Sequence, residues 1–208
     1  MPMSSSNCKS HYGKGICEMY GDEDIIRKRV AATAAKAHNI SNRVTIAGVD
    51  YSFSRREFDF GFSMLVPEEF EKMPEEAAQL KFPSIEKPKA ILANRDYRVC
   101  LTYNDIEPLP KDMNTRVSAF RAYTKKIRPA NVFLSYGVYD LSDNFHIGHY
   151  DYSYPVANGY LYNITFLVDL PDVGLLGRFV CPIEVKDKWE PLMRQMIQSI
   201  QVTAEEVL

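Results

Sequence analysis

Alternating apolar and polar positions between residues 58 and 103 predict the strands around which the chain is organised. From Phe58 to Val66 every second side chain is apolar, so the apolar set falls on one face of a strand. Segment 73–80 then carries a proline and two glutamates where a short helix would begin. Residues 90–93 and Tyr97–Tyr103 follow across a tight turn and predict a hairpin. These segments form a scaffold and contain no catalytic motif.

Apolar residues three and four positions apart predict two helices later in the chain. The first runs from about Asp112 to Ile127, with its charged side chains, including Arg116 and Arg121, turned to water. Flanking acidic residues cancel much of that charge, so we do not expect a basic recognition helix. The second is the C-terminal helix, for which Asp187 and Glu190 are spaced as a capping pair.

Further strands are predicted before and after the first of these helices. Their ranges are 44–46, 49–53, 132–140, 145–154, 159–169 and 175–184. Ala47-Gly48 separates the first two and indicates a turn or bulge. Residues 44 to 208 are therefore predicted to form a single domain, and residues 1 to 43 an N-terminal extension with one amphipathic helix that begins near Asp22.

The predicted hairpin of residues 145–154 and 159–169 has two candidate registers. An Asn158-Gly159 turn sets Tyr150 opposite Leu167, whereas a three-residue loop at 157–159 sets it opposite Phe166. We favour the second register because it gathers the aromatic and apolar side chains on one face. The other face then carries a polar set that we expect to face a partner, although solvent or a covering helix would also explain it. This set is His149, Asp151, Ser153, Asn163 and Thr165.

Catalytic and metal-binding interpretations of these histidines are weak. Alternate residues on a strand lie about 6.6 Å apart, so His149, Asp151 and Ser153 do not converge as a catalytic triad. Replacing His149 and Asp151 by alanine should then leave the fold nearly unchanged. A zinc site could use Cys8, His11, Cys17 and His38, but the usual second pair of closely spaced ligands is missing. We therefore expect no metal and no cofactor.

Composition narrows the class of protein. The 208 residues carry a net charge of −2, which argues against a phosphate-neutralising nucleic-acid binder. No apolar run reaches the roughly 18 residues of a membrane span, and no signal-peptide core precedes the domain. The four cysteines are too few for a disulfide scaffold, and Cys100 and Cys181 suit small packed residues in strands. Together these features predict a cytoplasmic protein.

Three phrases of the chain resemble proteins of the Mog1/PsbP-like superfamily. They are residues 62–73, in which a strand ends in a proline-marked segment, residues 88–101, which hold a hairpin turn, and residues 189–200, a late amphipathic helix. The resemblance covers about residues 44 to 203. It implies an α+β fold in which an antiparallel β-sheet is flanked by helices as an α/β/α sandwich. Members bind a small GTPase, support photosystem assembly or act as chaperone-like adaptors, and no functional motif carries over to this chain.

Two classes of function follow from these observations. The expected one is a non-catalytic protein-binding module of the adaptor or chaperone-like kind, whose partner is another protein. The alternative is a small hydrolase or metal-dependent enzyme whose site is assembled only in the fold. A deep pocket with several convergent titratable groups would favour the enzyme, and a shallow polar or aromatic surface would favour the binding module.

Overall fold

A computed structural model describes residues 39–83, 88–108 and 112–203 of the chain. The strands are β1 (Val44–Ile46), β2 (Val49–Tyr51), β3 (Phe53–Phe58), β4 (Phe62–Pro67), β5 (Glu71–Lys72), β6 (Ala90–Ala93), β7 (Cys100–Ile106), β8 (Val132–Ser142), β9 (Phe145–Val156), β10 (Gly159–Asp169), β11 (Gly174–Pro182) and β12 (Gln201–Val202). The helices are α2 (Glu75–Lys81), α3 (Met113–Ile127), the 3-10 turn η1 (Ile183–Val185) and α4 (Lys186–Gln198).

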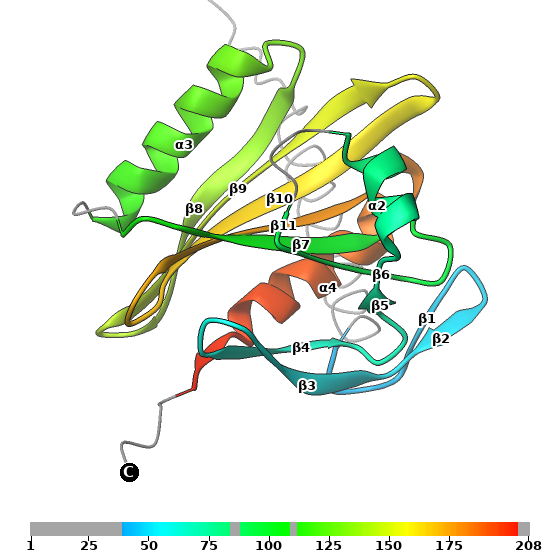
Figure 1. Cartoon of the computed structure of the whole chain (residues 1–208), viewed down its shortest axis with the longest axis horizontal. Coiled ribbons are helices and arrows are strands. Elements are labelled where there is room, and N and C mark those ends of the chain that lie inside the picture. Colours follow the sequence, from blue (N-terminus) through cyan, green and yellow to red (C-terminus); the bar gives the residue numbers. More distant parts are fainter. Residues whose placement is uncertain (1–38, 84–87, 109–111, 204–208) are drawn as a thin grey trace, which may run out of the picture. The chain divides into compact units, whose positions relative to one another are not determined.

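The centre of the fold is an antiparallel sheet of seven strands, in the order β5-β6-β7-β11-β10-β9-β8 (Figure 1). Its longest members, β8 to β11, follow one another in the chain and pair with their neighbours, as hairpin connections require. A smaller sheet of order β12-β4-β3 and a separate β1-β2 hairpin complete the described strands. Because β8 is the last strand of the large sheet, one of its two edges pairs with no described strand.

Both faces of the large sheet are covered. Helix α3 packs on β8 and β9, and α2 packs on β6 and β7 on the same face. Helix α4 lies on the opposite face, where it contacts β10, β11 and also β4 of the small sheet (Figure 1). The main hydrophobic core lies around α4 and includes Trp189, Phe166 and Phe62, each at most 2% exposed.

Most of the predicted elements form, and the exceptions have local causes. The predicted strand from Phe58 to Val66 is instead a hairpin, since residues 59–61 make a turn and Phe60 takes a positive φ of 73°. The turn after β6 extends through Tyr97, whose φ is 56°, so β7 begins at Cys100. Helix α4 begins one residue before Asp187, with Pro191 inside it. The predicted capping pair is therefore wrong.

Helix α3 spans the predicted residues, but two of its cations differ from expectation. Arg116 is 8% exposed and makes a two-pronged ion pair with Asp169, which raises the pKa of the guanidinium. Arg121 lies over the rings of Phe133 and Tyr136, with its guanidinium carbon 5.2 Å and 4.6 Å from their centres. The prediction that both face water is wrong, because long cationic side chains cover apolar surface with their stems and planar groups.

The structure confirms an α+β fold built mostly from antiparallel strands. The small sheet outside α4 adds a layer that a simple α/β/α sandwich lacks. Ile40, which was assigned to the N-terminal extension, belongs to the core cluster and is 7% exposed. In the part of the chain described here, no helix has the length and hydrophobicity needed to span a bilayer.

Candidate functional site

The β9–β10 hairpin does not adopt either predicted register. Val156 pairs with Gly159 across a two-residue Ala157-Asn158 turn, so Tyr150 lies opposite Thr165. The favoured register is therefore off by one residue, and a shift of one residue exchanges the partners of every side chain. Three members of the predicted polar set, at 149, 151 and 153, now face α4, while Asn163 and Thr165 share the α3 side with Tyr150.

The physical reason is that neither face of these strands is wet. Helix α3 covers one face and α4 the other, so both faces carry apolar side chains. The register was predicted by gathering the apolar side chains on one face, and that criterion is wrong for a sheet covered on both sides. His149, Asp151, Asn163 and Thr165 are all buried, and only Ser153 is partly accessible. The expected partner-facing surface is thus wrong in its geometry: these five residues do not form one surface.

Asp151, one of the five, is instead a buried carboxylate that ties α4 to the sheet. Asp151 is 1% exposed and accepts hydrogen bonds from the Ser135 amide at 3.0 Å and the Tyr162 hydroxyl at 2.8 Å. It also accepts one from the Ser135 hydroxyl and one from Nη2 of Arg194 at 3.2 Å. Burial, followed by the charge and hydrogen bond of Asp151, raises the pKa of Tyr162 above its usual value, so the phenol stays a donor.

Arg194 extends this cluster along α4. Its guanidinium donates to Glu190 at 3.0 and 2.9 Å and to the Tyr139 hydroxyl at 3.1 Å, and Lys186 lies 2.7 Å from the same glutamate. Burial opposes the charge of Arg194, but these hydrogen bonds raise its pKa above the usual value. Burial would raise the pKa of Glu190, yet its bonds to Lys186 and Arg194 lower it. Arg194 and Glu190 therefore remain charged at neutral pH, and the cluster, which we call the Asp151 clamp, connects α4 to β8, β9 and β10.

His149 lies beside the clamp and is neutral at pH 7. Its ring stacks on Tyr139 at 4.3 Å between centres, and Nδ1 is buried without a hydrogen-bond partner. Burial, followed by the charge of Arg194, lowers the pKa of His149 to about 4. A neutral imidazole packed on an aromatic ring explains why this residue tolerates the interior of the sheet.

Metal and thiol chemistry find little support in the described residues. No group of three or more His, Cys, Asp or Glu side chains there could hold a metal ion. The predicted zinc ligands Cys8, His11, Cys17 and His38 lie outside the described residues. Cys100 and Cys181 are buried free thiols, as expected for packed residues, and burial raises the pKa of Cys181 to about 12.

Two hollows in the described surface have their charged groups already engaged. A groove of about 650 Å³ between the β8–β9 turn and the end of α4 has Arg55 as its one charged lining residue, and this donates to Ser63 and to the carbonyl of Ser199. A hollow of about 210 Å³ at the start of α3 contains the paired Arg116 and Asp169. Neither presents a set of unengaged groups converging on a substrate.

The β8 edge of the large sheet, which pairs with no described strand, differs from these hollows. On β8, Val132, Leu134 and Tyr136 are 56%, 51% and 57% exposed. Asp140 is the one charged residue of this strand. Long edge strands are usually protected by charged residues or proline, because their unpaired backbone groups can pair with another chain. Large apolar side chains exposed together often mark a binding site.

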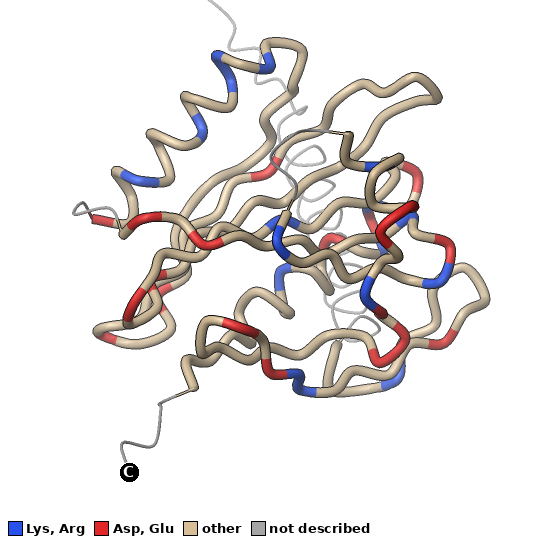
Figure 2. The backbone as a smooth tube through the Cα atoms, in the orientation of Figure 1, with Lys and Arg blue, Asp and Glu red and all other residues tan. Residues whose placement is uncertain are grey.

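Cations of α3 border this edge. Arg121 stacks on Tyr136 of β8, Lys125 follows it four residues later on the same flank of α3, and Arg128 caps the C-terminal end of the helix. No ion pair within the described residues involves any of these three. Figure 2 shows Lys and Arg, without Asp or Glu, along α3. We call Arg121, Lys125, Arg128, Val132, Leu134 and Tyr136 the β8 edge surface; Tyr136, which pairs with Tyr150, lies on its α3 side, and Val132, which pairs with Ser153, on its α4 side.

Sequence reasoning missed this surface, although one signal was present. Residues 113–139 contain five Lys or Arg and no Asp or Glu, in a chain whose net charge is −2. Only Arg116 of these five finds a described carboxylate. The assumption that neighbouring acidic residues cancel the charge of α3 was wrong for the flank beside β8.

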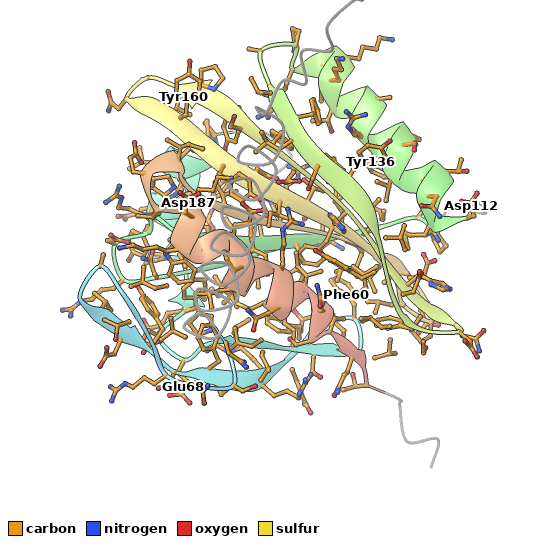
Figure 3. The ribbon with its side chains drawn as sticks, turned by 180° about the vertical axis from the view of Figure 1, so that it is seen from behind. Phe60, Glu68, Asp112, Tyr136, Tyr160 and Asp187 are labelled. Atoms are coloured by element: carbon orange, nitrogen blue, oxygen red, sulfur yellow. The ribbon has the colours of Figure 1, made fainter. Side chains whose placement is uncertain are left out.

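Tyr136, labelled in Figure 3, lies well apart from Tyr160 of the β9–β10 hairpin.

Comparison with known proteins identifies the fold. The chain has the Mog1/PsbP-like fold: it is similar to cyanobacterial PsbP (CyanoP) from Synechocystis sp. PCC 6803, with a TM-score of 0.56, 13% identity, and coverage of 76% of this chain and 95% of that one. It is also similar to a variant of Mog1, with a TM-score of 0.52, 10% identity, and coverage of 75% and 98%. No family model matches the sequence, and no curated protein matches it. The expected resemblance is confirmed at the level of the fold.

Proposed function

We propose that this chain is a non-catalytic protein-binding module of the adaptor or chaperone-like kind, and that it binds its partner through the β8 edge surface. The carrying observation is the nearly uncharged edge of β8, which pairs with no described strand and has three exposed apolar side chains. Aromatic side chains such as Tyr136 supply large contact areas at protein interfaces. We also propose that the large sheet, with α3 on one face and α4 on the other, is the α/β/α sandwich implied by the resemblance. The small sheet is then an addition outside α4.

The charged groups elsewhere support a binding module over an enzyme. Within residues 39–83, 88–108 and 112–203, the main cluster of titratable side chains is the Asp151 clamp, and its members hydrogen-bond to one another. The small-hydrolase alternative would need to break this clamp before any of these groups could act on a substrate. We place the protein in the cytoplasm in this proposal, because Cys100 and Cys181 are unpaired thiols, as suits a reducing compartment.

Quantitative affinity capture from the native cell tests the proposed function. The bait is the full chain, compared with a double variant, Leu134→Ser and Tyr136→Ser, and with Leu80→Ser as control. Leu80 is 86% exposed on α2, so the control removes an exposed apolar side chain from another surface. We expect the double variant to retain at least about tenfold less of the specifically captured protein, since central aromatic contacts contribute about 2 kcal/mol or more.

The control should retain that protein in full. Thermal unfolding within a few degrees of wild type establishes that both variants are folded. Equal retention by the wild type and the folded double variant would reject the β8 edge surface as the binding site. Loss of capture in the Leu80→Ser control would move the binding site to α2 and contradict the proposal in the same way.

A further inference from the structure

The outer side of β8 is shaped to receive an extended strand. Pairing of β8 with β9 is regular from Ser135 to Asp140 and is interrupted by a register shift on each side, at Phe133/Ser135 and at Asp140/Ser142. Within the regular stretch the side chains alternate between the two faces of the sheet, and the backbone groups that point away from β9 pair with no described strand. A strand edge of this kind provides main-chain hydrogen bonds to an incoming extended peptide.

The two faces beside that edge differ in charge. On the α3 face, Tyr136 lies under the guanidinium of Arg121, with 4.6 Å between the guanidinium carbon and the ring centre. Lys125 and Arg128 continue this row towards the start of β8, since α3 ends at Ile127 and β8 begins at Val132. On the other face, β8 presents Ser135 and Tyr139, which already contact the Asp151 clamp.

The spacing of the cations suits acidic residues on a strand. Residues four apart in a helix are separated by about one turn, or about 5.4 Å, and alternate residues of a strand by about 6.6 Å. Helix α3 runs alongside β8 in Figure 1. An added strand with a carboxylate at every second position would therefore set successive carboxylates beside successive cations. The intervening side chains would point to the opposite, less charged face.

We propose that the partner binds as an acidic, extended segment that adds to β8 as a new edge strand, with carboxylates beside Arg121, Lys125 and Arg128 and apolar residues between them. This inference rests on the proposed function and specifies its partner. It explains the cations of α3, which no described carboxylate neutralises on the β8 side. It also explains why an edge strand with exposed Val132 and Leu134 lacks the lysines that usually protect such edges.

Peptide binding to the full chain tests this inference. The probe is a capped peptide of about eight residues that alternates glutamate and valine, and the comparison peptide has lysine in place of each glutamate. Fluorescence anisotropy measures the affinity, and amide hydrogen exchange locates the binding. We expect the glutamate peptide to bind at least about tenfold more tightly than the lysine peptide and to protect backbone amides of β8, within residues 132–142.

Charge reversal supplies the matched variants. The double variant Lys125→Glu with Arg128→Glu should bind the glutamate peptide about tenfold or more weakly than the wild type does. Lys188→Glu, on the exposed side of α4, should bind it as tightly as the wild type. Failure of the glutamate peptide to bind, protection away from β8, or tighter binding of a thymidine oligonucleotide of equal charge would overturn the inference. If capture of a native partner still depends on Leu134 and Tyr136, such a failure rejects the acidic strand and leaves the proposed function standing.

Discussion

Asp151 shows how far the environment of one residue can depart from its sequence context. In the sequence it alternates with other polar residues and resembles a member of a wet strand face. In the structure it is a buried carboxylate held by an amide, two hydroxyls and a guanidinium from β8, β10 and α4. A buried charge is tolerated only when such partners compensate for the loss of water.

Asp151→Ala should destabilise the protein by about 3 to 5 kcal/mol, because it leaves Arg194 and the Tyr162 hydroxyl without their buried acceptor. The expectation from the sequence that alanine at this position leaves the fold nearly unchanged is therefore wrong, since Asp151 is 1% exposed. Chemical denaturation measures the change in the free energy of unfolding. Asp140→Ala is the matched control, since that carboxylate is exposed and His146 is its one ion-pair partner among the described residues, and it should cost less than about 0.5 kcal/mol. A cost for Asp151→Ala as small as that of the control would contradict the clamp.

His149 should make the protein less stable as the pH falls. Its pKa is about 4 in the folded chain and about 6.5 when unfolded, so the unfolded state binds the proton more readily. The stabilising effect of neutral His149 is complete above pH 6.5 and decreases by up to about 3 kcal/mol as the pH drops to 4. His149→Gln lacks this titration. Between pH 7 and pH 4 the wild type should therefore lose more unfolding free energy than His149→Gln does. An equal loss in the two proteins would exclude burial of a neutral imidazole.

At the scale of elements, periodicity predicted α2, α3 and strands β6 and β8 to β11 within a few residues. Those patterns are local, since a helix stripe or an alternating strand is decided by the chain's own neighbours. The turns and registers were harder to predict. The break at residues 59–61 needs a positive φ at Phe60, which apolar alternation does not signal, and the β9–β10 register depends on helices packed on both faces.

The same distinction applies to the candidate site. The run of cations in residues 113–139 is visible in the sequence. That β8 is an edge strand is not, because strand order depends on how distant segments pair. The exposure of Leu134 likewise follows from a register shift at Phe133/Ser135 that local alternation cannot reveal.

Gly148 allows α3 to approach β9 closely. An added Cβ there would lie 2.3 Å from Cγ2 of Val117 and 2.8 Å from Sδ of Met113. Gly148→Ala should thus destabilise the protein by about 1 to 3 kcal/mol through overpacking. Gly137→Ala, on the neighbouring strand, meets its nearest atom at 3.4 Å and should cost clearly less. Equal denaturation midpoints for the two variants would show that α3 is not seated against Gly148.

At the scale of the whole molecule, the lower boundary of the folded unit lies before the predicted residue 44. Ile40 joins the core, and its amide donates to Oε1 of Gln195 on α4 at 3.2 Å. The assignment of residues 44 to 208 to one domain stays a prediction. The packing of Ile40 nevertheless indicates that residues 39–43 belong with the described body.

Two truncated chains test that boundary. A chain beginning at Asn39 should unfold cooperatively. One beginning at Val44 should be less stable by about 2 kcal/mol, because it loses a buried isoleucine, and should melt about 4 to 8 °C lower. Thermal unfolding followed by circular dichroism provides the comparison. Identical melting temperatures would return the boundary to residue 44, and loss of a cooperative transition in both chains would show that earlier residues are required.

The arrangement of the molecule directs attention to one edge. Helices cover both faces of the large sheet, and the short strand β5 forms its other edge. The outer side of the long strand β8 carries apolar side chains and nearby cations and pairs with no strand of the described residues. The central claim is that this edge contacts a partner protein. Site-specific crosslinking in the native cell tests the claim at the level of a single side chain, whatever the identity of the partner.

A photoreactive benzoylphenylalanine placed at Tyr136 of the full chain should form a discrete crosslinked product with another protein. The same group at Tyr160, which is 52% exposed on the β9–β10 hairpin, should not. The group at Leu80 provides a second control. A discrete product from position 160 or 80 with none from position 136, or no product from any of the three in a folded chain, would contradict the account.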